Sequence, residues 1–502
     1  MKRYILSSLL ILVALLSMAQ KPDFSLVGFG VGTVGGTGGT SVTVTSYDQL
    51  AAAVVGTDKK VINVSGTITG PSGGVILDVG SNKSLIGVGT DASIKLVNLH
   101  LKNSQQIIIR NIIFSMVGST LGSDADIISI ETTSSNEVKY IWIDHCEFFN
   151  ETPTLPESAA KKDKYDGMID IKKSASLITI SWNYFHDHWK CSLIGFTATD
   201  TYDRKITYHH NHFQRIKSRA PSYRGGTGHI YNNYFEGLND PNAPTSEGVN
   251  SREQACLKVE NNYFIHYDKT IYCALDDVTL EGYAYGTGNV FDNTPGITAA
   301  TCSSFSPPYS YKMDKGDDVP CIVSSWSGVG KLDAQSYTLT TSVVGQGSIT
   351  VDPSCGGSYA AGTKVTLTAV PSVGSAFVKW TGAVTGTNPS ATLTIDAGKS
   401  VTAQFETAPL GMGESLLGTG NFKFYPSPVQ GMAFVDVYLN EETSTLLVIR
   451  DNLGQTVYSD SKTLSTGQNN LQLDVSYLPA GVYYCVLQSS NNKMSSKMFI
   501  KK

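Results

Sequence analysis

The sequence predicts an all-β protein in which a parallel β-helix is followed by two small β-domains. Its 502 residues allow about three domains at roughly 150 residues each. Only 16% of them are charged, well below the roughly 25% of an average soluble domain. Gly, Ser, Thr, Asn and Tyr fill the difference, which favours an extracellular β-rich architecture over a helical cytosolic enzyme. Short apolar runs bounded by Gly, Asn, Asp or Ser recur from about residue 42 to 300, and such runs are typical of strands.

The overall composition excludes two further classes of protein. A hydrophobic fraction of 41% is enough for a sizeable core, which rules out general disorder. The formal net charge of −5 is too small to indicate a nucleic-acid partner. We therefore expect a folded protein, monomeric, that binds no nucleic acid.

The N-terminus has the pattern of a secretory signal peptide over residues 1–19. Lys2 and Arg3 supply the positive start, an apolar run covers residues 4–16, and small residues precede a cleavage point after Ala19. A transmembrane anchor is the alternative. The stretch is short for a membrane span and no stop-transfer pattern follows it, so we expect export.

Export would permit disulfide bonds among the eight cysteines. Eight cysteines allow 105 pairings, so the connectivity cannot be deduced. Two pairs are close enough in sequence to be candidates, Cys256 with Cys273 and Cys302 with Cys321. No CxxC pair occurs, and a zinc site is therefore not expected.

A weak internal repeat supports the β-helix. An Asn-x-Phe unit occurs five times, at residues 183–185, 211–213, 233–235, 262–264 and 289–291. Its phenylalanines are 28, 22, 29 and 27 residues apart, and a period in the twenties without helical patterning indicates stacked β coils. We expect each Phe to stack on the next and the Asn side chains to bond along the ladder. An antiparallel sandwich would explain the strands but not this repeat. The Gly-rich residues 25–40 are expected to form a loop.

The repeat stops near residue 330, and a different pattern follows. Residues 336–406 alternate Thr or Ser with apolar residues and carry almost no charge, which predicts a small β-domain. The domain resembles bacterial surface repeat modules in three motifs, at 347–349, 361–369 and 377–380.

A linker at 407–419 leads to a last β-domain at 420–502. Four of its segments, at 424–428, 451–454, 478–483 and 498–502, together resemble the C-terminal sorting domain of type IX secretion. Residue 427 is Ser where that family usually has Asn. The resemblance implies a β-sandwich, a partnership with the type IX machinery, and passage through the periplasm to the cell surface or medium. The predicted β-helix domain then spans residues 20–330.

Charge is distributed unevenly along the predicted β-helix. Residues 124–170 contain eleven acidic and four basic residues, whereas residues 204–235 contain six basic residues, four His and no acidic ones. Stacked coils would bring the two segments side by side. Acidic oxygens suit Ca²⁺ and a basic cluster suits an anionic substrate, so the pair predicts a site for a polyanion bridged by Ca²⁺.

Four acidic residues are the candidate Ca²⁺ ligands: Asp124, Asp126, Asp166 and Asp170. The alternative for any one of them is turn chemistry, because Asp is common before strands and beside Gly. The basic candidates are Lys172, Lys173, Lys190, Arg215, Lys217, Arg219 and Arg224. Asp144 and His145 form a further candidate pair. His209 and His210 are adjacent and should face opposite sides of a strand, so a three-His zinc site is not expected.

At this point a family resemblance is plain. The motifs stand at 142–145 (Trp-Ile-Asp-His), 166–172 (Asp-Gly-Met-Ile-Asp-Ile-Lys), 181–190, 206–211, 219–221 (Arg-Ala-Pro), 224–226 (Arg-Gly-Gly) and 229–233. Together they resemble the pectate lyases of polysaccharide lyase family 1, over roughly residues 25–300. The resemblance implies a right-handed parallel β-helix and Ca²⁺-dependent cleavage of α-1,4-linked polygalacturonate by β-elimination, which gives 4,5-unsaturated products.

The resemblance also implies roles for individual residues. Asp126, Asp166 and Asp170 match the primary Ca²⁺ ligands, Asp124 a ligand position that varies, Lys190 the lysine on the substrate carboxylate, Arg219 the proposed Brønsted base and Arg224 a substrate-binding arginine. Some members have Glu in place of Asp166. Trp182 and Trp189 stand where other residues are common, so they are expected to alter subsites or packing. An arginine base is unusual because guanidinium pKa values normally exceed about 12.

Three other functions compete with this one. A pectin lyase acting on methyl-esterified polymer would not need the acidic cluster. A glycoside hydrolase would use water with paired carboxylates and would leave no double bond. A β-helical polysaccharide-binding or adhesion protein would bind the polymer without shortening it.

Overall fold

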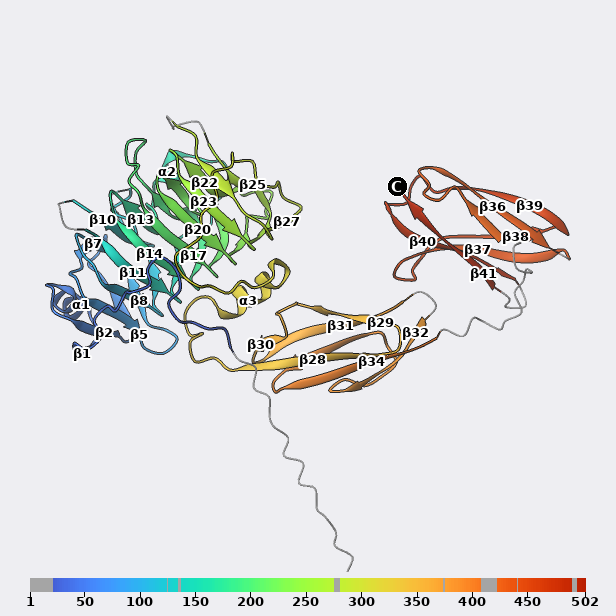
Figure 1. Cartoon of the computed structure of the whole chain (residues 1–502), viewed down its shortest axis with the longest axis horizontal. Helices are drawn as coiled ribbons and strands as arrows, with labels where there is room; N and C mark the ends of the chain where they lie inside the picture. The colour runs from blue at the N-terminus through green and yellow to red at the C-terminus, as the bar shows by residue number, and fades with distance from the viewer. Residues whose placement is uncertain are drawn as a thin grey trace, which may run out of the picture.

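The computed structural model describes residues 21–123, 125–133, 137–274, 280–372, 375–407, 422–439, 441–489 and 494–502. The predicted signal peptide at 1–19 lies outside these residues. Among the residues described, no helix is both long and apolar enough to cross a membrane. The predicted fold class is confirmed, because three stacked parallel sheets are followed by two largely antiparallel β-domains (Figure 1).

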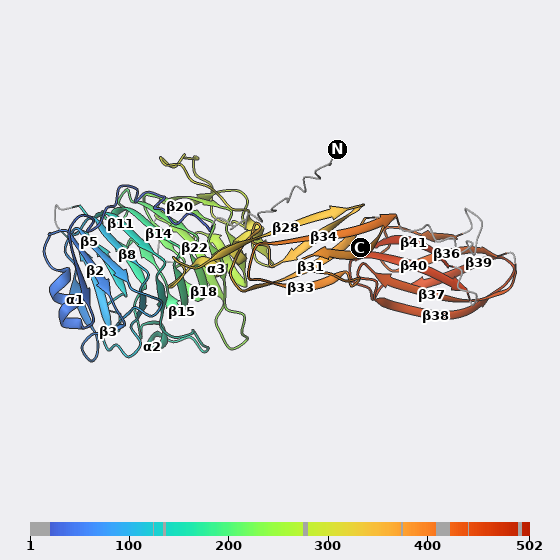
Figure 2. The same ribbon diagram turned by 90° about the horizontal axis from the view of Figure 1, so that it is seen from below.

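Each coil of the β-helix contributes one strand to each of three parallel sheets (Figure 2). The β1–β26 sheet contains, in the described chain, β1 (Thr40–Val44), β2 (Lys60–Val64), β5 (Lys83–Gly87), β8 (Ile107–Arg110), β11 (Lys139–Asp144), β14 (Ser176–Ser181), β17 (Lys205–His209), β20 (Thr227–Tyr231), β23 (Cys256–Glu260) and β26 (Tyr283–Tyr285). The β4–β25 sheet contains β4 (Val75–Asp78), β7 (Val97–Lys102), β10 (Ile128–Glu131), β13 (Ile169–Lys172), β16 (Leu193–Ile194), β19 (Ser222–Arg224), β22 (Ser246–Arg252) and β25 (Tyr267–Tyr272). The β3–β27 sheet contains β3 (Thr67–Thr69), β6 (Ser93–Lys95), β9 (Ile113–Ser115), β12 (Glu147–Phe149), β15 (Tyr184–Lys190), β18 (His212–Ser218), β21 (Tyr234–Glu236), β24 (Tyr263–Ile265) and β27 (Val290–Asp292).

Two ladders of identical side chains align these coils, as the repeat predicted. Phe114, Phe148, Phe185, Phe213, Phe235, Phe264 and Phe291 stack inside the β-helix with centroids 4.4–5.5 Å apart. The amides of Asn183, Asn211, Asn233, Asn262 and Asn289 bond one to the next at 2.9–3.0 Å. Each ladder takes one side chain from the same position of every coil. A shift in the register of one coil relative to the next would therefore break both ladders.

The Asn ladder follows a sharp corner between the β1–β26 and β3–β27 sheets. Trp182, His210, Asn232 and Asn261 occupy this corner with φ between 48° and 54°. Residues other than Gly rarely adopt this left-handed backbone conformation, and Asn tolerates it better than most. The next residue in each coil is a ladder Asn, whose side chain satisfies backbone groups that the corner leaves unpaired.

The Gly-rich residues 25–40 form no strand before Thr40, as expected, but they are pressed onto the outer face of the β1–β26 sheet. The N–H groups of Phe29, Gly30 and Gly36 donate to the hydroxyls of Thr207, Thr179 and Ser84 at 2.9–3.0 Å. A Cβ at Gly36 would overlap the backbone carbonyl of Lys60. The glycines are therefore needed for close approach to four different coils.

Helices are few in the described chain. Helix α1 (Tyr47–Val54) buries Leu50, Ala53 and Val54 in the β-helix core at its first coils. A short helix, α2 (Ala159–Lys162), precedes β13. A 3₁₀ turn at Gly316–Asp318 leads into α3 (Val319–Trp326), whose Trp326 packs with Trp182.

Two β-domains follow α3, and their described strand pairs are antiparallel except for one parallel pair, Ser336–Val344 with Lys399–Thr407. The first has sheets β30-β28-β34-β32 and β29-β31-β33, formed by β28 (Ser336–Val344), β29 (Gly347–Asp352), β30 (Ser358–Ala360), β31 (Thr363–Pro371), β32 (Ser375–Gly382), β33 (Ser390–Ile395) and β34 (Lys399–Thr407). The second has sheets β35-β36-β39 and β38-β37-β40-β41, formed by β35 (Phe422–Tyr425), β36 (Met432–Leu439), β37 (Thr443–Asp451), β38 (Thr456–Leu464), β39 (Gly467–Asp474), β40 (Gly481–Ser489) and β41 (Met494–Lys501). Each domain has its own hydrophobic core.

Both candidate disulfide pairs were wrong. The structure joins Cys256 to Cys302 and Cys321 to Cys355. Cys256 begins β23, whereas Cys273 follows β25 in a different sheet, so their closeness in sequence is not closeness in space. Cys321 lies on α3 and bonds to the first β-domain, which ties that helix to the domain after it.

We predict that Asn211→Ala lowers the free energy of unfolding by about 3 kcal/mol, because the change strands several buried partners at once. The Asn211 amide donates to Ile180 O and Asn233 Oδ1 and accepts from the backbone and side chain of Asn183, at 2.9–3.0 Å. Chemical denaturation would measure the loss. Asn289→Ala is the matched control, because Asn289 ends the ladder and is partly exposed, so water can replace its bonds. Equal losses for the two variants would contradict the ladder's role.

Candidate active site

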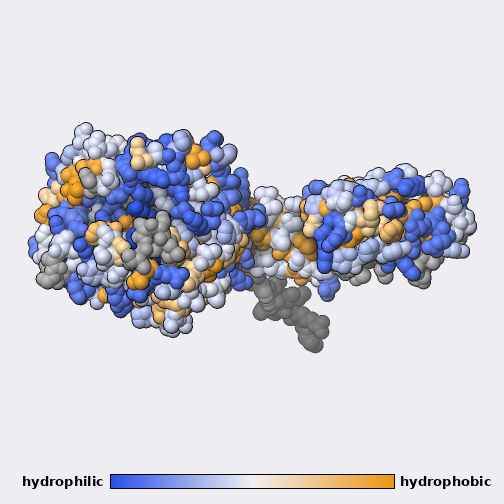
Figure 3. Space-filling view, turned by 90° about the horizontal axis from the view of Figure 1, so that it is seen from above, coloured by the Kyte–Doolittle hydropathy of each residue, from blue (hydrophilic) through white to orange (hydrophobic). Residues whose placement is uncertain are grey.

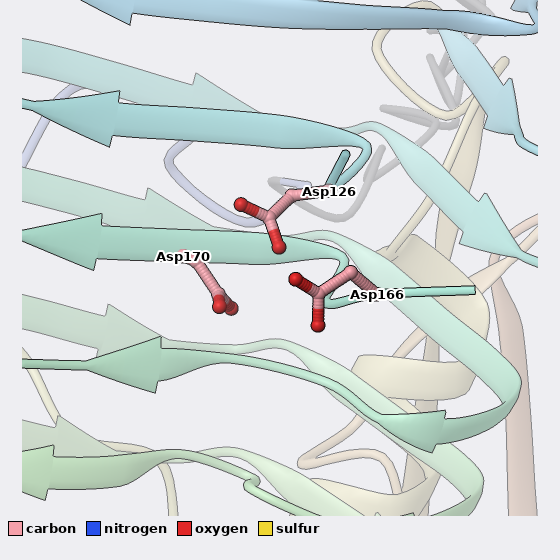
Figure 4. Close-up of side chains that lie close together, drawn as sticks. All are labelled: Asp126, Asp166 and Asp170. Carbon is pink, nitrogen blue, oxygen red and sulfur yellow. The ribbon is translucent and has the colours of Figure 1, made fainter. Parts of the chain in front are cut away.

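Three of the four predicted acidic residues meet at the edge of the β4–β25 sheet. Asp126 lies just before β10, Asp166 lies before β13, and Asp170 lies within β13. Because β10 and β13 are parallel neighbours with Ser129 opposite Asp170, the three carboxylates converge (Figure 4). One oxygen from each lies within 4.8 Å of the others. Asp124, the fourth candidate, lies outside the described residues.

Gly167 makes this convergence possible. Its N–H donates to Asp126 Oδ1 at 3.0 Å. A Cβ at this position would overlap the carboxylate of Asp170, so another residue here would fill the space between the acidic groups. Sequence reasoning noted the Asp-Gly-x-x-Asp motif but did not assign a role to its glycine.

Burial makes the cluster electrostatically unusual. Asp126 and Asp170 are each only 1% exposed. Burial raises the pKa of both carboxyls, and the charges of neighbouring aspartates raise them further, whereas Lys172 lowers the pKa of Asp126 and Arg219 that of Asp170. Several buried oxygens of like charge are what a hard cation such as Ca²⁺ neutralises. The residues present therefore fit a Ca²⁺ site.

Two lysines border the cluster. Lys190 ends β15, and its Nζ lies 3.2 Å from Asp166 Oδ1 and 3.0 Å from Asp163 Oδ1. Lys172 Nζ lies 3.4 Å from Asp126 Oδ2. Burial would lower the pKa of Lys172, but the surrounding carboxylates raise it, so it stays charged. Sequence reasoning placed Lys190 correctly beside the acidic residues and gave no role to Asp163.

The two candidate arginines differ in their surroundings. Arg219 has φ 61° in the turn before β19, and its carbonyl accepts the Ser192 N–H at 2.7 Å. It lines a cavity of about 370 Å³. Arg224 lies on β19, is 4% exposed, and donates from Nη1 to the Gly195 carbonyl at 2.8 Å. Arg219 thus borders open space, whereas Arg224 is packed into the wall.

His188 is a supporting residue whose role sequence reasoning missed. It is buried on β15, and burial lowers its pKa to about 4, so the ring is neutral at neutral pH. Its Nε2 bonds to the Asp166 carbonyl at 2.6 Å. The neutral ring can donate this bond and hold the backbone that carries Asp166. Because His188 is two residues before Lys190 on one strand, its side chain points the same way.

The other polar candidates lie apart from this cluster. Asp144 and His145 belong to the β1–β26 sheet, where Asp144 accepts from Arg110 at 2.6 Å and from Ser181 at 2.7 Å. The expectation that His209 and His210 face opposite sides was wrong, because His210 stands at a left-handed corner rather than in the strand. Their Nδ1 atoms lie 2.9 Å apart.

Trp182 and Trp189 contribute to packing. Trp182 is 2% exposed and stacks on His210 with centroids 4.2 Å apart, and Trp189 is 6% exposed. Neither ring is available on the surface. Figure 3 shows one face of the β-helix, where apolar residues are scattered among hydrophilic ones.

Comparison with known proteins matches three segments of the chain to families. Residues 3–332 match the pectate lyase family, 337–409 the divergent InlB B-repeat domain, and 423–501 the secretion system C-terminal sorting domain. The last match confirms the predicted type IX sorting domain and indicates export to the cell surface or beyond.

Individual relatives agree with the first match. The chain is 40% identical to a pectate trisaccharide-lyase of Bacillus licheniformis over 322 residues, which cover 62% of this chain and 88% of that protein. It is 35% identical to pectate lyase A of Aspergillus niger over 309 residues, which cover 61% and 87%. The crystal structure of pectate lyase Bsp165PelA from Bacillus sp. N165 in complex with trigalacturonate aligns with a TM-score of 0.52 and 32% identity, covering 62% of this chain and all of that one. The chain belongs to the pectate lyase family, a family of polysaccharide lyases.

Proposed function

We propose that the chain is an exported, calcium-dependent pectate lyase. It cleaves α-1,4-linked polygalacturonate by β-elimination and releases 4,5-unsaturated oligogalacturonates. The observation that carries this proposal is the convergence of Asp126, Asp166 and Asp170 beside Lys190, at the sheet edge where Arg219 also lies. The names of the relatives, which include a structure with bound trigalacturonate, support the substrate class.

The reaction needs a proton removed from C5 of a uronate and the C4–O bond broken. Loss of the proton leaves its electron pair to form the C4–C5 double bond, and the departing oxygen is protonated. When bound by Asp126, Asp166 and Asp170, Ca²⁺ supplies positive charge that stabilises the uronate carboxylate and so acidifies the C5 proton. Lys190 adds a second positive charge at the same carboxylate.

Arg219 is the base in this proposal, because its Arg-Ala-Pro motif matches that of the family's proposed base and because it borders the cavity. It takes the C5 proton in its neutral form. Its left-handed backbone at φ 61° is a conformation that only the surrounding structure can impose. Arg224 is proposed as a substrate-binding arginine, and its Nη1 is held by the Gly195 carbonyl. Asp124 is proposed as a further ligand.

The acidic cluster distinguishes this function from its nearest rival. A methyl-esterified pectin brings no carboxylate charge to a bound cation, so a pectin lyase has no use for three converging carboxylates. Two of these carboxylates are buried at a cost to stability. A bound cation would offset that cost, beyond what Lys172 and the Gly167 N–H already offset.

The activity itself is tested with polygalacturonate by following unsaturated product at ultraviolet wavelengths. We expect product with Ca²⁺ and none after chelation. Asp170→Asn should raise the Ca²⁺ concentration needed for half-maximal rate about tenfold or more, because it removes one ligand charge. Asp187→Asn is the control, since Asp187 is half-buried and also paired with a cation, but with Arg215 on another sheet. Absence of product with Ca²⁺ would refute the function, and chelator-resistant activity would refute the metal.

Arg219→Ala should keep the fold and bind Ca²⁺ but lose roughly 10²–10⁴-fold in kcat, the range expected for a general base. Turnover and the Ca²⁺-induced rise in Tm would be measured together. Arg215→Ala is the matched control, because Arg215 is also a left-handed arginine, paired with Asp187. A wild-type rate in Arg219→Ala would remove this residue from the chemistry.

The domain boundaries and the export route also belong to the proposal. Signal cleavage after Ala19 delivers the chain to the periplasm, and residues 420–502 direct its onward export, joined through the module at 336–406 and a linker at 407–419. The enzyme acts as a monomer.

Deleting residues 420–502 should leave the specific activity within about twofold and retain the protein in the periplasm, because that domain has a core of its own. Activity in the periplasmic and external fractions would be compared in a host with the type IX machinery. Normal external release of the truncated chain would contradict the sorting role.

A further inference from the structure

A second charged cluster lies beyond Arg219, toward the last coils of the β4–β25 sheet. Glu247 on β22 stands opposite Lys269 on β25. Lys217, on β18, is the third member. Glu247 and Lys269 line the same cavity as Arg219, about 370 Å³ in volume. The proposed mechanism uses none of the three.

The contacts of Glu247 hold both lysines in place. Glu247 Oε1 lies 3.2 Å from Lys269 Nζ and 3.4 Å from Lys217 Nζ. The Tyr272 hydroxyl donates to Glu247 Oε2 at 3.1 Å. The side chains are 12% exposed for Lys217, 25% for Glu247 and 48% for Lys269, so Lys217 is the most buried of the three and Lys269 reaches toward solvent.

The cluster is net positive despite its acid. Lys217 and Lys269 flank one carboxylate, and Arg252 lines the same cavity. Neighbouring strands are about 4.8 Å apart, and β22 and β25 follow β19 as the next two strands of the sheet. A polyuronate carries a carboxylate on every sugar, so a chain that reacts beside Arg219 brings further carboxylates over these coils.

We propose that Lys217 and Lys269 form an additional subsite for the carboxylate of a sugar neighbouring the reacting one. Glu247 is the positioning residue, since it orders two long side chains that would otherwise lose conformational freedom on binding. This inference rests on the proposed lyase function. It also assigns these lysines a part in selecting unesterified polymer, because a methyl ester offers them no charge.

Replacing each lysine by Met keeps its length and removes its charge. Lys269→Met and Lys217→Met should each raise KM for polygalacturonate about tenfold, the loss of one charge-assisted contact, with kcat within twofold. The preference for polygalacturonate over partly methyl-esterified pectin should fall by a similar factor. Lys258→Met is the matched control, because Lys258 bonds to Glu260 and Tyr311 at 2.8 Å on the β1–β26 sheet, and its KM should stay unchanged.

For Glu247→Gln, the direction of the change in KM tests the positioning role. A positioning role predicts that KM rises about threefold, because the lysines lose their anchor. A carboxylate that merely repels the substrate predicts a fall in KM. Such a fall, wild-type KM in both lysine variants, or an equal rise in Lys258→Met would overturn the subsite. Absence of unsaturated product from the wild-type enzyme would instead overturn the lyase function, so the two failures are distinguishable.

Discussion

The in-register stacking of parallel coils is the constraint on which the rest of this structure depends. Phe213 stacks between Phe185 and Phe235, and Asn211 bonds to both Asn183 and Asn233. A coil that slipped by one residue would turn each of these side chains to the wrong side of its strand. With the register set, residues far apart in sequence stand at one position on adjacent strands. Ser129, for example, lies opposite Asp170. This fixed register determines which side chains of adjacent strands meet at the candidate active site.

Electrostatic repulsion limits which charged side chains can stand side by side on adjacent strands. Asp126 and Asp170 are buried with like charges beside them, which raises the pKa of both carboxyls. Lys172 and the Gly167 N–H offset part of this cost. They do not remove it, because Lys172 reaches Asp126 at 3.4 Å and no closer. The site is therefore held together by the coils around it. The buried carboxylates destabilise the fold, and a bound cation would neutralise them.

Features that recur in every coil could be predicted from the sequence. Features that depend on the backbone at one corner, or on contacts between distant segments, could not. The Asn-x-Phe units predicted the coils because the same residues recur at every turn. The Asp-Gly-x-x-Asp motif indicated Asp166 and Asp170 because both stand in one segment, and the expected stacking of coils added Asp126 from the coil before. By contrast, the orientation of His210 depends on a left-handed corner that alternation along a strand does not describe. The disulfide of Cys256 depends on where residues near 302 return to the β-helix. The role of Glu247 depends on Lys217 and Lys269, which reach it from two other strands, and no local pattern marks that meeting.

The ladders that align the coils and the proposed reacting groups lie on different sheets. This separation explains how such an enzyme can change its substrate selectivity. The Asn ladder and its corner join the β1–β26 and β3–β27 sheets, and the Phe ladder is buried behind the β3–β27 strands. The proposed reacting groups lie on or beside the β4–β25 sheet, where the inward side chains, such as Ile169 and Ile171, complete the core. Bonds between outward side chains of that sheet, such as Asn98 with Ser129 and Glu247 with Lys269, are separate from the two ladders. One coil can therefore present carboxylates and another Lys269 without disturbing the stacking. In the proposed complex each sugar lies over a different coil, so a substitution on one strand would change the contacts of one sugar.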